Sequence, residues 1–216
     1  MSSSRRGGVR RTLRGAYHFA LSGPGILQAG GPVAARGGRV RHDEAVTVKH
    51  ATSSVYVFSR RPDGWRVGLI EHPRFGRMMP PGGHVEAYET QAEAALREVA
   101  EESGLSVRLV DPLAAALPDG FAPVLVAPPW WIVEHPVPAD NHLARPHVHV
   151  DHLYLAQARS SQPVTEPAHP FGWYAAGDLA GLVMFDDSRT LAGSLLAHLD
   201  GADDGDGPAI LRQYQA

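Results

Sequence analysis

The stretch GGHVEAYETQAEAALREVAEESGL, residues 82–105, decides the fold of this chain. It crowds three glutamates, Glu98, Glu101 and Glu102, into five positions. Positions i, i+3 and i+4 share one face of an α-helix, so we expect the three carboxylates to project together. Each like-charge pair costs about 0.2–0.5 kcal/mol in an isolated helix. A solvated acidic face is the plain explanation. A bound divalent cation is the alternative, because Mg²⁺ and Mn²⁺ prefer carboxylate oxygens.

The residues around the glutamates predict a helix with defined ends. Thr90 and Glu93 have the spacing of a capping box, and Gly104 stands where a left-handed C-terminal cap is needed. Small and apolar residues recur at helical spacing and predict a buried stripe that the glutamates avoid. The stripe consists of Ala92, Ala95, Leu96, Val99 and Ser103.

The residues that flank the glutamates favour a metal site over a solvated acidic face. Gly82 and Gly83 follow two prolines and allow backbone conformations closed to other residues, so this turn can aim a carbonyl at a metal. Arg97 lies four residues from both Glu93 and Glu101 and can hold carboxylates in place. As a pattern, residues 83–105 read G-x5-E-x7-R-E-U-x-E-E-x-G-U, where U is a bulky aliphatic residue.

That pattern is the Nudix box, and on it the chain resembles the Nudix hydrolases. Every defined position is filled, by Gly83, Glu89, Arg97, Glu98, Val99, Glu101, Glu102, Gly104 and Leu105. The resemblance implies an α/β/α sandwich with a mixed β-sheet. It also implies hydrolysis of a pyrophosphate bond, dependent on Mg²⁺ or Mn²⁺, in a nucleoside diphosphate linked to another moiety.

The resemblance assigns roles to six residues. Glu101 and Glu102 match the principal metal ligands, and Glu98 matches a residue that binds metal or acts as the general base. The Gly82 carbonyl matches a backbone ligand. The orienting pair is Arg97 and Glu89, and the catalytic set is Glu98, Glu101, Glu102 and Arg97.

Strands dominate the rest of the chain. Alternating or β-branched runs predict strands at 47–58, 65–72, 106–110, 124–127, 130–134 and 147–158. The first two form a hairpin, and residues 73–86 read as a loop rich in Pro and Gly. Residues 171–182 indicate a short strand and a helical turn, and 187–199 a closing helix. This order is typical of an α/β or α+β sandwich.

Composition divides the chain into three parts. Residues 1–44 form a basic arm rich in Gly and Arg, expected to be partly ordered. Residues 45–200 form the Nudix domain, and 201–216 an acidic tail. Nine of the 20 basic residues lie in the first 50 positions. Such an arm can bind phosphate backbones, but a solvated terminus is the plainer explanation, and we expect no nucleic-acid partner.

Two absences in the sequence predict where the protein acts. The chain contains no cysteine, which excludes disulfides and thiolate metal sites and fits a reducing compartment. No apolar run approaches the ~20 residues that span a bilayer. We therefore expect a cytoplasmic protein without a membrane partner, acting on a small-molecule nucleotide. The resemblance also allows a homodimer.

Residues outside the box supply further candidates. Arg74 and Arg77 precede the glycine turn and could meet substrate phosphates. In the HVHVDH run, His147, His149 and Asp151 alternate onto one strand face and could hold a metal or a phosphate. Of these, His149 and Asp151 are the substrate-binding candidates. The alternative of a solvated sheet face or of core histidines is favoured here. Glu134 is another candidate base, whereas His72 and His84 receive no role.

Two other functions stay open on the same fold. A sensor module that binds a nucleotide without hydrolysing it is one, although such modules carry degenerate boxes and this box is intact. An isomerase of isoprenoid diphosphates is the other, but that branch resembles enzymes with a catalytic cysteine.

Overall fold

The computed structural model describes residues 47–112 and 117–203 of the 216-residue chain. The predicted basic arm over residues 1–44 lies outside the described residues. So does the predicted acidic tail beyond residue 203. Both therefore stay predictions, as does the boundary between arm and domain.

The described chain forms eight strands, two α-helices and one short 3₁₀-helix. In chain order the strands before the first helix are β1 (Lys49–Arg61), β2 (Gly64–His72), β3 (Arg77–Met79) and β4 (Gly82–His84). Helix α1 (Gln91–Ser103) is followed by β5 (Val107–Val110), β6 (Trp131–Val137), β7 (His147–Ala158) and β8 (Phe171–Tyr174). The 3₁₀-helix η1 (Ala176–Gly181) and helix α2 (Asp186–Asp203) close the described chain.

All eight strands join one mixed sheet. Its central path runs β3-β2-β1-β7-β5, and β4, β6 and β8 pair with β1, β7 and β2 respectively. Strands β1 and β7 pair in parallel, from Lys49 opposite Val148 to Phe58 opposite Gln157, whereas the other pairs are antiparallel. The parallel pair brings residues about 100 positions apart in sequence side by side.

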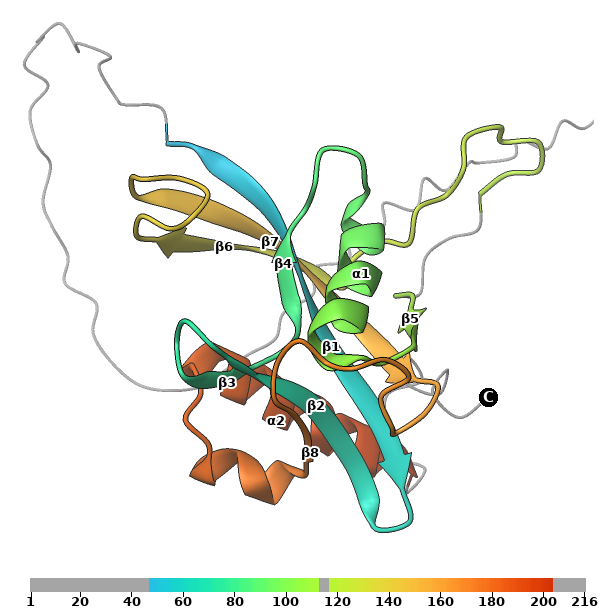
Figure 1. Ribbon diagram of the computed structural model, residues 1–216. Coiled ribbons are helices and arrows are strands. Elements are labelled where there is room, and N and C mark those ends of the chain that lie inside the picture. The colour runs from blue at the N-terminus through green and yellow to red at the C-terminus, as the bar shows by residue number, and fades with distance from the viewer. Residues whose placement is uncertain (1–46, 113–116, 204–216) are drawn as a thin grey trace, which may run out of the picture. The chain divides into compact units, whose positions relative to one another are not determined.

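The two helices cover opposite faces of this sheet (Figure 1). On one face α1 packs Ala95 and Val99 against Val55 and Tyr154. On the other face α2 packs Leu196 and its neighbours against a core that includes Phe58, Leu69 and Leu155. Alternate residues of β1 and β7 thus serve opposite cores, as the period of two in a strand requires. The predicted α/β/α sandwich with a mixed sheet is confirmed.

Helix α1 begins and ends at the predicted caps. The Thr90 hydroxyl accepts from the Glu93 N–H, and the Glu93 carboxylate accepts from the Thr90 N–H, which completes the capping box. Gly104 adopts φ 69°, and its N–H donates to the Ala100 carbonyl. One part of the stripe prediction is wrong. Leu96 is 40% exposed, whereas Ala94, outside the predicted stripe, is fully buried.

Three further predictions need correction, one each for a strand, a loop and a helix. Residues 124–127 form no strand, and the side chains of Val124, Leu125 and Val126 are exposed. Apolar composition predicted a strand there, but no neighbouring strand pairs with it in the described chain. The loop predicted over residues 73–86 contains β3 and β4. The closing helix extends beyond Leu199 to Asp203.

No helix in the described part of the chain is both long enough and apolar enough to cross a membrane.

Candidate active site

Strand β4 lies against helix α1 and presents its backbone to the glutamates. The Val55 N–H donates to the Pro81 carbonyl and the Val85 N–H to the Ala51 carbonyl. This antiparallel ladder makes Ser53 and Gly83 the hydrogen-bonded pair. The polar backbone atoms of Gly82 therefore point away from β1. Accordingly, the Gly82 N–H donates to Glu102 Oε2 at 2.9 Å.

Arg97 is the centre of the ion pairs on α1. Its guanidinium donates to both oxygens of Glu89, at 2.7 and 3.0 Å, in a two-pronged contact. It also donates to Glu98 at 2.8 Å and to Glu101 at 3.1 Å. A further N–H reaches the His84 carbonyl at 3.1 Å, so Arg97 ties the helix to the end of β4. The predicted orienting pair of Arg97 and Glu89 is present as a direct contact.

Glu98, Glu101 and Glu102 differ in environment. The Glu101 side chain is 59% exposed, whereas those of Glu98 and Glu102 are 13% and 11% exposed. Burial raises the pKa of Glu98, although Arg97 opposes this rise. Burial raises the pKa of Glu102 to about 7, opposed by the hydrogen bond from Gly82 and reinforced by the charges of Glu98 and Glu101. The sequence predicted the shared face but not the burial of Glu102.

His169 joins this site without having been predicted. Its Nε2 lies 3.3 Å from Glu102 Oε1, and its backbone N–H donates to the Glu102 carbonyl at 3.1 Å. The Ala168 N–H likewise donates to the Glu101 carbonyl, so this loop caps the end of α1. No local pattern marks His169, because 67 residues separate it from Glu102 and only the fold brings them together.

Comparison with known proteins identifies this arrangement. A protein-family model described as NUDIX domain matches residues 49–188, more than half of the chain. The chain belongs to the Nudix family. It is a pyrophosphohydrolase of that family, with the box on β4 and α1.

Solved structures with this Nudix fold include relatives from several organisms. A NUDIX-family hydrolase from Clostridium perfringens is 26% identical with a TM-score of 0.52, covering 68% of this chain and 96% of that chain. An Ap4A hydrolase from C. elegans, in a binary complex, is 16% identical with a TM-score of 0.48, covering 70% and 98%. The dihydroneopterin triphosphate pyrophosphohydrolase from E. coli is 16% identical with a TM-score of 0.46, covering 68% and 94%. No curated protein sequence matches the chain.

The donor set of the Nudix box fits a hard divalent cation. Three carboxylates share one helix face, and the Gly82 backbone points to the same side of β4. Arg97 donates to Glu89, Glu98 and Glu101, while Glu102 accepts from a neutral N–H. Buried carboxylates with raised pKa values gain most from a divalent cation, which favours their ionised form. Mg²⁺ and Mn²⁺ bind such oxygen donors.

The adjacent glycines Gly82 and Gly83 leave room for different neighbours. A Cβ at Gly82 would overlap the Ser53 carbonyl and the Ser54 Cα, which are backbone atoms. A Cβ at Gly83 would overlap the Glu98 carboxylate, which is the mobile end of a side chain. One glycine therefore protects the pairing of β4 with β1, and the other protects the position of a catalytic candidate.

Alanine substitutions separate these two roles. We expect Gly82→Ala to lower the free energy of unfolding by about 1–3 kcal/mol through overpacking. We expect Gly83→Ala to change stability little but to lower turnover by about 10²-fold, because it displaces Glu98. Urea unfolding and steady-state kinetics of both variants measure this. Equal losses of stability in the two variants would show that Gly83 is also structural.

The raised pKa of Glu102 predicts that the free energy of unfolding depends on pH when a chelator keeps the protein free of metal. The folded state keeps the proton up to pH about 7, and the unfolded state releases it near the ordinary value of 4.5. Stability from this carboxyl is therefore fully present below pH 4.5 and is lost as pH rises through 7, by about 2–3 kcal/mol. The lowered pKa of His84, about 4, acts in the opposite direction between pH 4 and 6.5.

Comparison with Glu102→Gln isolates the carboxyl from the histidines. We expect the variant to be as stable as the wild type at pH 4 and more stable at pH 8, both in EDTA. Thermal melting at the two pH values measures the difference. A constant difference between the two proteins would contradict a raised pKa at Glu102.

The predicted substrate-binding arginines make contacts with the backbone in this structure. The Arg77 guanidinium lies 4.6 Å from the Phe185 ring centre and donates to the Met184 carbonyl at 3.0 Å. Arg74 donates to the Ala139 carbonyl at 3.2 Å. Their contact with substrate stays a prediction.

The candidates outside the box separate into different environments. Asp151 is buried, and its two oxygens accept from the hydroxyls of Thr52 and Ser54, at 2.9 and 2.8 Å, across the β1–β7 pair. Glu134 forms an exposed ion pair with Lys49. His149 instead lies in a group with three other metal-ligating side chains, His84, Asp140 and His147. His149 and Asp151 therefore share a strand face but not a site, and their contact with substrate stays a prediction.

Proposed function

We propose that this Nudix domain hydrolyses the pyrophosphate bond of a nucleoside diphosphate linked to another moiety, and that it needs Mg²⁺ or Mn²⁺. Glu98, Glu101, Glu102 and the Gly82 carbonyl would hold the ion. The observation that carries this proposal is the burial of Glu98 and Glu102 beside a single guanidinium, which leaves carboxylate charge uncompensated.

A divalent ion supplies, when bound, neutralisation of the pyrophosphate oxygens and a water of lowered pKa. The chain itself contributes position and proton transfer. Arg97 fixes the Glu98 carboxylate from one side, and Gly83 gives that carboxylate room. Burial raises the pKa of Glu98, which makes its carboxylate a stronger base toward the proton of an attacking water. Glu98 is therefore the candidate general base.

Glu102 is held by the fold rather than by Arg97. The Gly82 N–H fixes one oxygen and His169 lies beside the other. This support limits the rotamers of Glu102, and a ligand that is already oriented loses little entropy on binding. Glu101 is more exposed, and its carboxylate contacts Arg97. It completes the ligand set on the side that faces solvent.

The test is product release from a panel of substrates. Nucleoside triphosphates, nucleotide sugars, dinucleoside polyphosphates and coenzyme A are each incubated with Mg²⁺, Mn²⁺ or EDTA, and nucleotide products are separated by chromatography. We expect hydrolysis of at least one substrate with either ion and none in EDTA. Hydrolysis that persists in EDTA would contradict the metal requirement.

A sensor module is the alternative function, and the same panel distinguishes it. A module that only binds nucleotide would show saturable binding by calorimetry with no product under any condition. The intact set of three glutamates with an oriented Arg97 favours the enzyme.

A further inference from the structure

Four metal-ligating side chains outside the glutamate set converge on one point. They are His84 in β4, Asp140 in the β6–β7 connection, and His147 and His149 in β7. One ligand atom from each lies within 4.8 Å of all the others. Three separate segments of the chain are needed to build this group, so helix or strand periodicity alone does not account for it.

The measured separations match a tetrahedral ion. His147 Nε2 lies 3.1 Å from His149 Nε2, and Asp140 Oδ2 lies 3.3 and 3.4 Å from these two nitrogens. Zinc binds nitrogen and oxygen ligands at about 2.0–2.2 Å, and a tetrahedron with such bonds has edges of about 3.3–3.6 Å. The two separations between Asp140 and the histidines thus already match the edge lengths of a zinc site, and the His147–His149 separation is about 0.2 Å shorter.

The hydrogen bonds of His147 fix which of its nitrogens carries a lone pair. His147 Nδ1 lies 3.0 Å from the Arg145 carbonyl, which can only accept, so Nδ1 carries the proton. In neutral His147 the lone pair is therefore on Nε2, which faces the Asp140 carboxylate. His147 is 2% exposed, so water does not separate these two acceptors. A cation between them turns repulsion into coordination.

The other two ligands, Asp140 and His84, each have an atom free to bind an ion. Asp140 Oδ1 accepts from the N–H groups of His142 and Leu143, both at 2.8 Å, which leaves Oδ2 for the histidines. His84 Nε2 is buried without a hydrogen-bond partner in the described structure. Metal-binding carboxylates and histidines are commonly oriented by such outer contacts with backbone groups.

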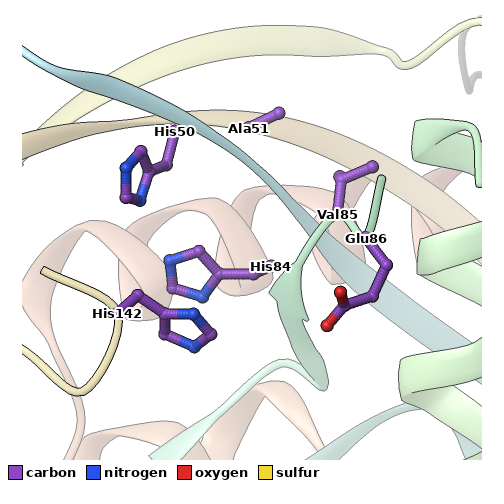
Figure 2. A pocket seen from close by; sticks show the side chains of 6 residues that line it. All are labelled: His50, Ala51, His84, Val85, Glu86 and His142. Carbon is purple, nitrogen blue, oxygen red and sulfur yellow. The ribbon is translucent and has the colours of Figure 1, made fainter. Parts of the chain in front are cut away.

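Further histidines surround this group and leave it accessible. The His142 ring stacks on His84 with centroids 3.7 Å apart, and His50 lies 5.8 Å from His84 (Figure 2). These three rings line a cavity of about 260 Å³ that also borders Glu86. The cavity gives an ion a route to His84.

We propose that His84, Asp140, His147 and His149 form a second metal site, which binds one Zn²⁺ ion and is distinct from the glutamate site. Three imidazoles and a carboxylate suit a borderline-soft ion such as Zn²⁺, whereas Mg²⁺ prefers oxygen ligands. Four protein ligands fill a tetrahedral shell, so the ion is structural. It links β4, whose His84 carbonyl holds Arg97, to β7 and the connection before it.

Metal binding to the whole chain tests the site. The protein is stripped with chelator, titrated with Zn²⁺ by calorimetry, and analysed for metal content after dialysis. We expect one Zn²⁺ per chain and a higher melting temperature of the loaded protein. We also expect Co²⁺ to give the intense visible absorption of tetrahedral coordination. A pale spectrum typical of six-coordinate Co²⁺, or loss of Zn²⁺ during dialysis, would overturn the proposal. The four side chains would then be held together by a shared proton instead of a metal ion.

Variants assign the ion to these residues. Asp140→Asn keeps an acceptor for the two backbone N–H groups, so the turn is preserved, and His149→Gln removes a partly exposed ring. We expect each to weaken Zn²⁺ binding by about 100-fold or more. His135→Gln, on the neighbouring strand β6 and outside the group, is the matched control and should bind normally. Circular dichroism verifies that each variant is folded.

Glu102→Gln distinguishes the two metal sites. We expect this variant to bind Zn²⁺ as tightly as the wild type, because Glu102 is not part of the histidine group. Loss of Zn²⁺ in Glu102→Gln, with normal binding by Asp140→Asn, would place the ion at the glutamates and overturn the proposal. The Co²⁺ spectrum of the wild type decides the case if a variant fails to fold.

Discussion

Glu102→Gln should lower kcat/KM for pyrophosphate hydrolysis by about 10²–10³-fold or more while leaving the fold intact. The substitution removes one negative charge from the proposed metal ligands and keeps the size of the side chain. Its amide oxygen can still accept from the Gly82 N–H, so the contact between α1 and β4 survives. Losses of this size follow removal of a single preoriented group that stabilises charge in a transition state.

Glu93→Gln is the matched control for this loss. It removes one charge from the same helix, but glutamine can still accept the capping-box hydrogen bond from Thr90. Steady-state kinetics at several Mg²⁺ concentrations compare the two variants, and circular dichroism compares their folds. Near-normal activity of Glu102→Gln at low Mg²⁺ would remove Glu102 from the ligand set.

Arg97→Met should reduce both stability and turnover. The Glu89 side chain is 7% exposed and would lose its two-pronged partner, which leaves its charge with only the Glu86 N–H as a hydrogen-bond donor among the described residues. Loss of one member of a buried ion pair costs about 3–5 kcal/mol, and we expect about 2 kcal/mol here because the Arg97 side chain is 25% exposed. Turnover falls as well, because Glu98 and Glu101 lose their orienting contact.

A second substitution tests the cause of the stability loss. In the Arg97→Met background, Glu89→Gln removes the carboxylate charge that has lost its ion-pair partner. This double variant should recover part of the stability but not the activity. Arg97→Lys should recover little of either, because an ammonium cannot form the two-pronged contact. Urea unfolding of the single and double variants gives the coupling energy. Additive losses from the two single variants would show that Arg97 and Glu89 act independently.

The chain's local chemistry was sufficient to predict helix α1. Its ends depend on Thr90, Glu93 and Gly104, whose capping hydrogen bonds reach no more than four residues along the chain. The shared face of Glu98, Glu101 and Glu102 follows from helical geometry alone. For the same reason, the strands with clear alternation, such as β1, β2 and β7, were predicted in their correct places.

Local patterns failed where neighbours decide the outcome. Residues 124–127 have the composition of a strand, but a strand needs a partner and this segment has none in the described sheet. Leu96 is exposed and Glu102 is buried, the reverse of what the helical pattern predicted. The position of β4 and its Gly82 N–H determines which side of α1 is covered.

The sequence by itself thus determined the helix, its caps and the spacing of its carboxylates, since these interactions lie within a few residues. Tertiary structure alone brought His169 to Glu102, and His84 and Asp140 to His147 and His149. The physical reason lies in strand pairing and loop contacts: β1 pairs with both β4 and β7, which brings His84 to the histidines of β7, and the segment before β8 bonds to the end of α1, which brings His169 to Glu102. Contacts between segments so far apart in sequence leave no periodic trace in the chain, and only the folded structure reveals them.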